Sequence, residues 1–225
     1  MTNPIAGVLA IHNAFRADMK RIDAAALDAA RGKPGLAATI ERFRFFNEVL
    51  EWHAEGEDTL IGPLLESVAP SVYATYEADH RGLDAAFAAL RDAVSVRDPV
   101  ETARATSAFK FHLDLHLDKE DAHMYRLLGE RVPVAELGRA IGQMGRSAPR
   151  ERFPEVVAWM FPLMSLDDRV SMTLDWQRGM PPQAFDGAVQ LIQRAIGDDW
   201  AALSQRISNG ARPTATPALH LGETP

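Results

Sequence analysis

The stretch from Phe109 to Tyr125 constrains the fold most strongly, because a helix here has to bury charged and polar groups. Its sequence, FKFHLDLHLDKEDAHMY, has no Gly or Pro, and its apolar residues recur at three- and four-residue steps, which predicts a helix. One face of that helix carries Phe109, His112, His116, Glu120, His123 and Leu127. Burying imidazole and carboxylate groups without partners costs several kcal/mol. Charged partners could satisfy them, but a metal ion shared by His and Glu one turn apart would do so better.

The composition excludes several kinds of site. The 225-residue chain contains no cysteine, which rules out disulfides, thiolate zinc sites, iron–sulfur clusters and a Cys nucleophile. Its net charge of −7 leaves no overall basic footprint for nucleic acid or an anionic membrane. No apolar run approaches the roughly 20 residues that a bilayer requires, and the N-terminus is a poor signal peptide. We therefore expect a cytoplasmic protein with neither a nucleic-acid partner nor a membrane partner.

The three predicted helices that precede this one also carry His or Glu residues within their apolar faces. Helices are predicted over about 4–30, 36–67 and 71–96, and the helix of the opening stretch extends from Pro99 to about Arg131. His12 lies in the apolar stripe of the first helix, His53 and Glu57 in that of the second, and His80 in that of the third. Gly62-Pro63 predicts a kink or an end within the second helix, and Ser71 is a candidate N-cap.

Four long helices with short connections predict an all-α, up-down-up-down four-helix bundle over residues 1–132. At a rise of about 1.5 Å per residue, His12, His53, Glu57, His80, His112 and His116 fall within a few ångströms of one level. Residues 133–208 form a C-terminal helical extension, with shorter helices expected over 134–146, 155–164, 167–178, 185–196 and 198–207. Residues 209–225 are rich in Gly, Pro, Thr and Ala and are predicted to be disordered.

A single histidine on an apolar face is usually a satisfied core residue, but four helices here each carry one at the same level. A hydrogen-bonded network of histidines and carboxylates is the alternative to a metal site, and it is costly if any member lacks a partner. Imidazoles mixed with carboxylates suit iron, manganese or zinc. Six or more ligands exceed the need of one tetrahedral zinc ion, whereas two ions bridged by Glu57 and Glu120 account for the number.

This arrangement resembles the hemerythrin family, in its HHE cation-binding branch. The resemblance covers about residues 5–131 and rests on His12, HAEGE at 53–57, His80 and HLDKE at 116–120. It implies two non-haem iron ions with oxo or hydroxo bridges, held by His12, His53, Glu57, His80, His116 and Glu120. It also implies an open position for a small diatomic or peroxide ligand.

Three further residues are candidate ligands. Oxygen-carrying hemerythrins have a second histidine one turn after the third-helix ligand, where this chain has Asp84. They also take an aspartate five residues after the fourth-helix histidine, a spacing that Asp121 holds here. His112 is a ligand, a residue that orients a ligand, or a core residue. No catalytic side chain is assigned.

Three functions follow as hypotheses. The first is a di-iron protein that binds or processes oxygen, peroxide or nitric oxide, acting in oxidative stress; as an enzyme it would be an oxidoreductase acting on peroxide or another small oxidant. The second is a metal- or oxygen-responsive regulatory module that contacts a protein partner, or a second copy in a homodimer, through the C-terminal helices. The third is an iron- or zinc-binding structural bundle without catalysis.

Overall fold

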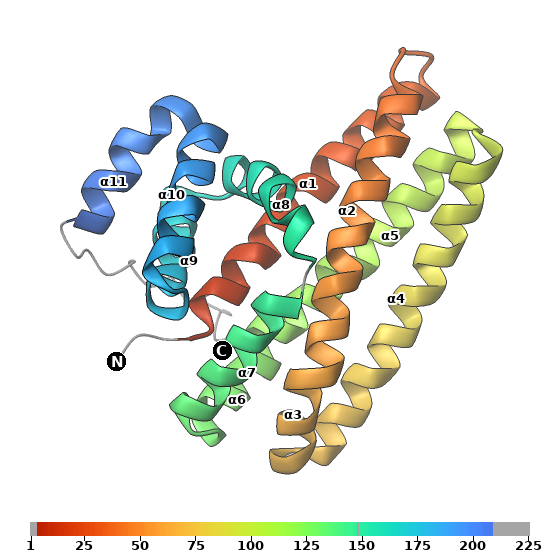
Figure 1. Cartoon of the computed structure of the whole chain (residues 1–225). Coiled ribbons are helices and arrows are strands. Elements are labelled where there is room, and N and C mark those ends of the chain that lie inside the picture. The colour runs from red at the N-terminus through yellow and green to blue at the C-terminus, as the bar shows by residue number, and fades with distance from the viewer. Residues whose placement is uncertain (1–3, 148, 209–225) are drawn as a thin grey trace, which may run out of the picture.

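The computed structural model describes residues 4–147 and 149–208, and this part of the chain is helical, with no strand. The four predicted long helices are present, and they run up and down alongside one another as a bundle (Figure 1). They are α1 (Ala6–Ala30); α2 (Leu36–Gly56), continued by η1 (Glu57–Ile61) and α3 (Gly62–Val68); α4 (Pro70–Val96); and α5 (Pro99–Lys119), continued by η2 (Glu120–Met124) and α6 (Tyr125–Arg131). The predicted all-α bundle is therefore confirmed.

The helix ends follow local chemistry, with one correction. Gly32 and Gly35 have positive φ values of 83° and 128° in the loop after α1, a backbone region that glycine enters without strain. The Asp98 side chain caps α5 by accepting hydrogen bonds from the backbone N–H groups of Val100 and Glu101. The proposed N-cap at Ser71 is wrong: α4 begins one residue earlier, at Pro70, because proline is well tolerated in a first helical turn.

Two of the long helices contain a turn of wider, π-helical pitch, and each of these turns begins at a glutamate. η1 starts at Glu57 and η2 starts at Glu120. Gly62-Pro63 marks the first break in the sequence, as predicted, whereas nothing comparable marks the second. The hydroxyl of Tyr76 donates a hydrogen bond of 2.6 Å to the carbonyl of Lys119, where α5 changes pitch. π-Helical turns of this kind occur often at functional sites, since they change the direction in which side chains point.

Two apolar clusters fill the bundle, and a polar layer lies between them. One cluster lies toward the end formed by the loop after α1 and includes Phe15, Phe43, Phe46 and Phe109. The other lies toward the opposite end and contains, among others, Ile61, Leu65, Met124 and Tyr125. The buried His and Glu side chains of the helices occupy the layer between these clusters, so bulk water is largely excluded from it.

The C-terminal extension packs along α1 and α2 rather than forming a separate body (Figure 1). It comprises α7 (Val134–Ser147), α8 (Phe153–Met160), α9 (Leu166–Gly179), α10 (Pro182–Ile196) and α11 (Trp200–Ser208), close to the predicted ranges. Ala10 and Ala14 of α1 belong to the apolar core of the extension, so α1 is buried on two faces.

Trp159 of α8 joins the extension to the bundle. Its ring centroid lies 5.5 Å from that of Phe15, and its indole N–H donates a 2.6 Å hydrogen bond to Asp18. None of the described helices is long and apolar enough to cross a membrane. The tail predicted to be disordered, 209–225, lies outside the described residues.

Candidate metal centre

Six side chains predicted as ligands meet in the polar layer of the bundle. Within the described parts of the chain, they form two groups of possible metal donors that share Glu57: His12, His53 and Glu57 in one, and Glu57, His80, His116 and Glu120 in the other. Each comes from the helix to which the sequence assigned it: α1, α2 with η1, α4, and α5 with η2. All but His80 are buried.

The first group has the spacing of ligands on a single ion. The Nε2 atoms of His12 and His53 lie 2.9 Å apart, and Nε2 of His53 lies 3.3 Å from Oε1 of Glu57. Two donors about 2.1 Å from one ion and at right angles lie about 3.0 Å from each other. Nε2 of His12 is also 3.7 Å from Oε1 of Glu57. These donor atoms therefore converge on one position that a cation could fill.

The second group converges in the same way and leaves donor atoms without partners. Nε2 of His116 lies 3.1 Å, and Nε2 of His80 lies 3.7 Å, from Oε1 of Glu120. Nε2 of His80 and both carboxylate oxygens of Glu120 are buried without a hydrogen-bond partner among the described residues. Burying polar atoms without a hydrogen-bond partner costs free energy unless a bound ion or ligand satisfies them. The residues present therefore fit a metal ion.

Two aspartates orient two of the histidines from a neighbouring helix. Asp121 Oδ1 lies 2.6 Å from Nδ1 of His12, and Asp58 Oδ1 lies 2.7 Å from Nδ1 of His80. An ionised carboxylate can only accept, so each Nδ1–H donates, and each Nε2 is directed into the centre. Arg16 holds the other oxygen of Asp121 at 2.8 Å.

The buried charges of the site stabilise one another. Burial alone would raise the pKa of Glu57, but the neighbouring His53 and His12 hold it well below its usual value. For Glu120, burial and the charge of Glu57 act upward, yet His116 and His80 lower its pKa overall. Both carboxylates are therefore ionised at neutral pH and available to a cation.

The pKa values of the two histidines with aspartate partners, His12 and His80, are shifted upward instead. Burial lowers the pKa of His12, but hydrogen bonds with Asp121 and Glu57 and the charge of Glu120 raise it to about 10. Burial likewise lowers the pKa of His80, but its contacts with Asp58 and Glu120 raise it to about 10. A metal ion would take the place of these protons, because it supplies the positive charge that the carboxylates favour.

Tyr125 adds a contact that holds Glu57 in place. Its hydroxyl donates a 2.5 Å hydrogen bond to Oε1 of Glu57, and the whole side chain is buried. Burial, together with the charges of Glu57 and Glu120, raises the pKa of Tyr125 well above its usual value. The phenol is therefore a stable donor that restricts the orientation of the shared carboxylate.

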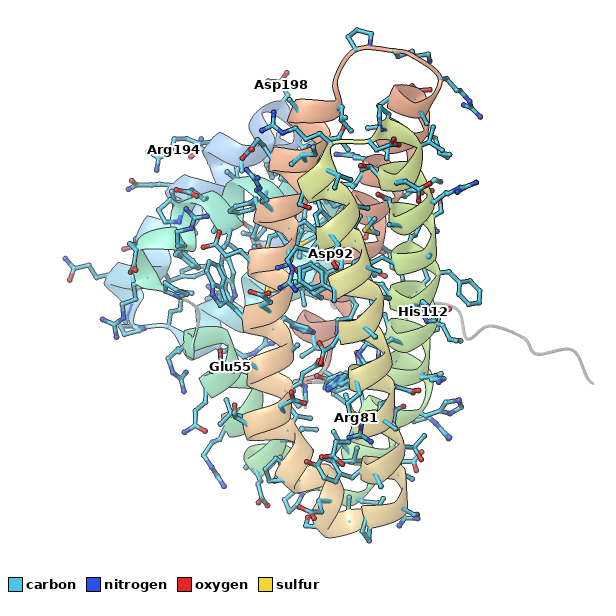
Figure 2. The ribbon with its side chains drawn as sticks, turned by 90° about the vertical axis from the view of Figure 1, so that its right-hand side faces the viewer. Glu55, Arg81, Asp92, His112, Arg194 and Asp198 are labelled. Atoms are coloured by element: carbon cyan, nitrogen blue, oxygen red, sulfur yellow. The ribbon has the colours of Figure 1, made fainter. Side chains whose placement is uncertain are left out.

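Three of the candidate ligands, His112, Asp84 and Asp121, belong to neither donor group. His112 and Asp84 are exposed and belong to neither donor group; Figure 2 shows His112 on the outer surface of α5. His123 is exposed as well, so the buried face of this helix is narrower than its spacing indicated, in part because η2 shifts the residues after Glu120. Asp121 belongs to neither donor group, because its carboxylate bonds the far side of the His12 ring and Arg16.

Sequence reasoning missed Asp58 and Tyr125. A signal for Asp58 was present: HAEGED at 53–58 and HLDKED at 116–121 place an aspartate at the same offset in both motifs. Nothing in the spacing identified Tyr125, since its position depends on the pitch of η2.

The fold and the converging donors define a metal-binding four-helix bundle. The chain belongs to the hemerythrin HHE cation-binding domain family, whose model matches residues 3–128. No solved structure shows a significant match to this chain.

Curated relatives include three proteins of Arabidopsis thaliana. The chain is 27% identical over 201 residues to zinc finger protein BRUTUS, a match that covers 86% of this chain and 16% of the relative. Two BRUTUS-like zinc finger proteins match at 22% over 188 residues and 24% over 182 residues, covering 79% and 75% of this chain. The chain thus spans 14–16% of the length of these relatives. The matches extend past the bundle and include part of the C-terminal extension.

Proposed function

We propose that this protein holds two non-haem iron ions and uses them to bind or process a small oxidant: oxygen, peroxide or nitric oxide. The observation that supports this proposal is the pair of donor groups that share Glu57 in a buried layer. Two ions in contact with one carboxylate match the donor number better than one ion does. The chain has no cysteine, and therefore none of the thiolate ligands that are typical of zinc fingers.

Each ion has a proposed set of residues. His12, His53 and Glu57 would hold one ion, and His80, His116 and Glu120 the other, with Glu57 and Glu120 placed between them. When bound, the iron pair supplies reversible changes of oxidation state and an open position for the small ligand. If the protein is an enzyme, this chemistry makes it an oxidoreductase acting on peroxide or another small oxidant.

The protein's own residues contribute orientation and exclusion of water. Asp121 and Asp58 fix the ring orientation of the two histidines that they bond. Tyr125 restricts Glu57, and the apolar clusters above and below the layer limit access of bulk water. These features keep a reactive centre in a fixed geometry with few competing ligands.

The test is elemental analysis and an ultraviolet–visible spectrum of freshly purified protein, followed by addition of oxygen, peroxide or nitric oxide. About two irons per chain and a spectral response to one of these are expected. His116→Ala should lose iron, whereas His112→Ala, an exposed histidine on the same helix, should retain it. Zinc alone, or iron-loaded protein without any spectral response, would contradict the proposal and favour a structural bundle.

A regulatory role is the second candidate, and the contact between α7 and η1 favours it. Gly56 directly precedes η1, and a Cβ atom at this position would lie 2.6 Å from Cγ of Met144 in α7. A change in η1 on metal binding would therefore shift α7. Through α7 it would alter the contact with a protein partner or a second copy bound to the C-terminal helices. Equal hydrogen-exchange rates in α7 with and without metal would contradict this role.

A further inference from the structure

The outward face of α5 carries large apolar side chains where water would be expected to lie. α5 packs against α1 and α4, so the side chains that point away from both helices should be polar. Six large apolar side chains are exposed among the described residues, and three of them lie on α5: Val100 at 48%, Phe111 at 65% and Leu115 at 45%. Steps of eleven and four residues place all three on one face of the helix. Exposed apolar residues that gather on one face indicate a surface that another molecule covers.

This face continues along the whole helix and into η2 as a stripe of exposed residues at steps of three or four. We call it the α5 stripe, and it consists of Val100, Arg104, Ala108, Phe111, Leu115, Asp118 and Ala122. Steps of three and four in alternation are typical of a helix that packs lengthwise against one other helix. The buried donors of the metal centre, His116 and Glu120, lie on the opposite face, so the α5 stripe is a separate surface.

The two charges of the α5 stripe are placed symmetrically about Phe111. Arg104 lies seven residues before it and Asp118 seven residues after it. Their side chains are 73% and 71% exposed, so both charges are available to a partner. The apolar ends of the stripe, Val100 and Ala122, each lie eleven residues from Phe111. The stripe has no net charge, so it does not favour a strongly acidic or a strongly basic partner.

A pattern with this symmetry is complementary to itself. In a twofold interface, each residue contacts a residue of the partner whose own contact is reciprocated. If two α5 helices pair antiparallel and cross at Phe111, Arg104 of each copy approaches Asp118 of the other, and the two Phe111 rings meet at the axis. A parallel pairing would instead bring Arg104 against Arg104, which is unfavourable. The present ion pairs of Arg104 and Asp118, each 2.9 Å long, are exposed and therefore cost little to exchange.

The surroundings of the α5 stripe leave room for a second helix. In Figure 2, α4 and α5 lie on the side of the bundle away from the C-terminal helices, and His112 marks the outer surface of α5. The exposed residues of α4 at three- and four-residue steps include Ala78, Gly82, Ala85 and Ala89. A Cβ atom on Gly82 would meet nothing within 4 Å. Side chains this small on the neighbouring helix allow the backbone of a partner to approach.

We infer that a second copy of this chain packs on the α5 stripe, with the two α5 helices antiparallel and centred on Phe111. This inference goes beyond the proposed function, because it requires no metal and uses a surface other than the C-terminal helices.

The first test is sedimentation of the full chain over the micromolar range. We expect a reversible dimer, and we expect Phe111→Glu to raise its dissociation constant at least about tenfold, because two like charges would then meet at the axis. Val134→Glu is the matched control: Val134 is 47% exposed on α7, outside the α5 stripe, and this variant should dimerise like the wild type. A wild-type chain that stays monomeric would overturn the inference, and so would a dimer that Phe111→Glu leaves intact.

The second test uses the charges to examine the pairing itself. Arg104→Glu and Asp118→Lys should each weaken the dimer by at least about threefold, because each creates two like-charge contacts across the axis. An equimolar mixture of these two variants should form a mixed dimer, because every contact in it joins opposite charges again. Recovery in the mixture also shows that both variants are folded. If each variant alone dimerises as well as the wild type, the pairing of Arg104 with Asp118 is wrong.

The third test distinguishes antiparallel from parallel helices by crosslinking. The chain has no cysteine, so single introduced thiols report their own position. In the antiparallel pair, the two copies of residue 108 lie about 9 Å apart along the helix axis, and those of residue 122 about 33 Å apart. A short bismaleimide should therefore link Ala108→Cys to itself but not Ala122→Cys. Equal linking of both variants would show a parallel pairing, and linking of neither would show that the copies meet elsewhere; either result overturns the inference.

Discussion

The histidine–aspartate pairs set the chemistry of this site at the scale of single residues. A histidine bonded through Nδ1–H to a carboxylate is a stronger and better oriented ligand through Nε2. The two pairs are not equivalent, however. The side chain of Asp121 is 26% exposed and is also bonded to Arg16, whereas that of Asp58 is 60% exposed. A water-exposed partner holds its histidine less firmly, because solvent competes for the carboxylate.

Asp121→Asn should therefore weaken metal binding more than Asp58→Asn. We expect a loss of about 10- to 100-fold in affinity for the ion bound by His12, and a smaller loss at His80 for Asp58→Asn. Competition with a chromophoric chelator measures both affinities, and the electronic spectrum of the iron-loaded variants reports the ligand change directly. Asp118→Asn is the control, since this aspartate bonds Arg16 but no histidine. Equal affinities in all three variants would show that the aspartates do not orient ligands.

The π-helical turns are the feature at the element scale that the sequence predicted least well. The helices, their order and the level of the six donor side chains follow from apolar spacing and from the Pro and Gly breaks. The pitch of η2 does not, because EDAHM contains no helix breaker and its conformation depends on packing. That is also why the exposure of His123 and the position of Tyr125 could not be derived from an ideal helix.

The packing of α7 on η1 leads to a second prediction. Gly56→Ala adds a Cβ atom 2.6 Å from Cγ of Met144, so the Met144 side chain or α7 has to shift. We expect the free energy of unfolding to fall by about 1–3 kcal/mol, although alanine favours a helix over glycine by about 1 kcal/mol. Chemical denaturation measures this change. Gly145→Ala, in α7 with nothing within 4 Å, should not destabilise the fold.

The double variant Gly56→Ala/Met144→Ala separates this clash from a general effect of the substitution. Removing Cγ of Met144 should restore space for the new methyl group, so the two changes together should cost less than the sum of their separate costs. Strictly additive effects would mean that Gly56 is not needed for the close approach of α7.

At the scale of the whole molecule, α1 connects the metal centre to the C-terminal extension. This helix carries His12 toward the bundle and Ala10 and Ala14 into the core of the extension. A change in the orientation of α1 would therefore be transmitted to α9, which packs along it. The sequence indicated the extension but not this shared helix, because small alanine residues give no sign of which neighbour they contact.

Metal binding should also depend on pH, with a sign set by the two histidines. Their carboxylate contacts raise the pKa of His12 and of His80 from 6.5 to about 10. In the metal-free protein these pairs contribute stability that is complete below pH 6.5 and is lost as pH rises through about 10. Metal binding requires neutral histidines, so it must release these protons across the same range.

Affinity for the metal should consequently rise with pH by about tenfold per unit for each proton displaced. Isothermal titration of iron(II) under anaerobic conditions at pH 8, in buffers of different ionisation enthalpy, measures the protons released. Release at pH 8 is the discriminating result, because histidines with an ordinary pKa of 6.5 would already be neutral there. An affinity that does not change between pH 7 and pH 8.5 would show that the metal does not replace protons on His12 and His80. The metal-free protein should lose stability as the pH rises from 6.5 towards 10, whereas the metal-bound protein, which has already released these protons, should change little over that range, so thermal unfolding of both forms provides an independent check on the sign.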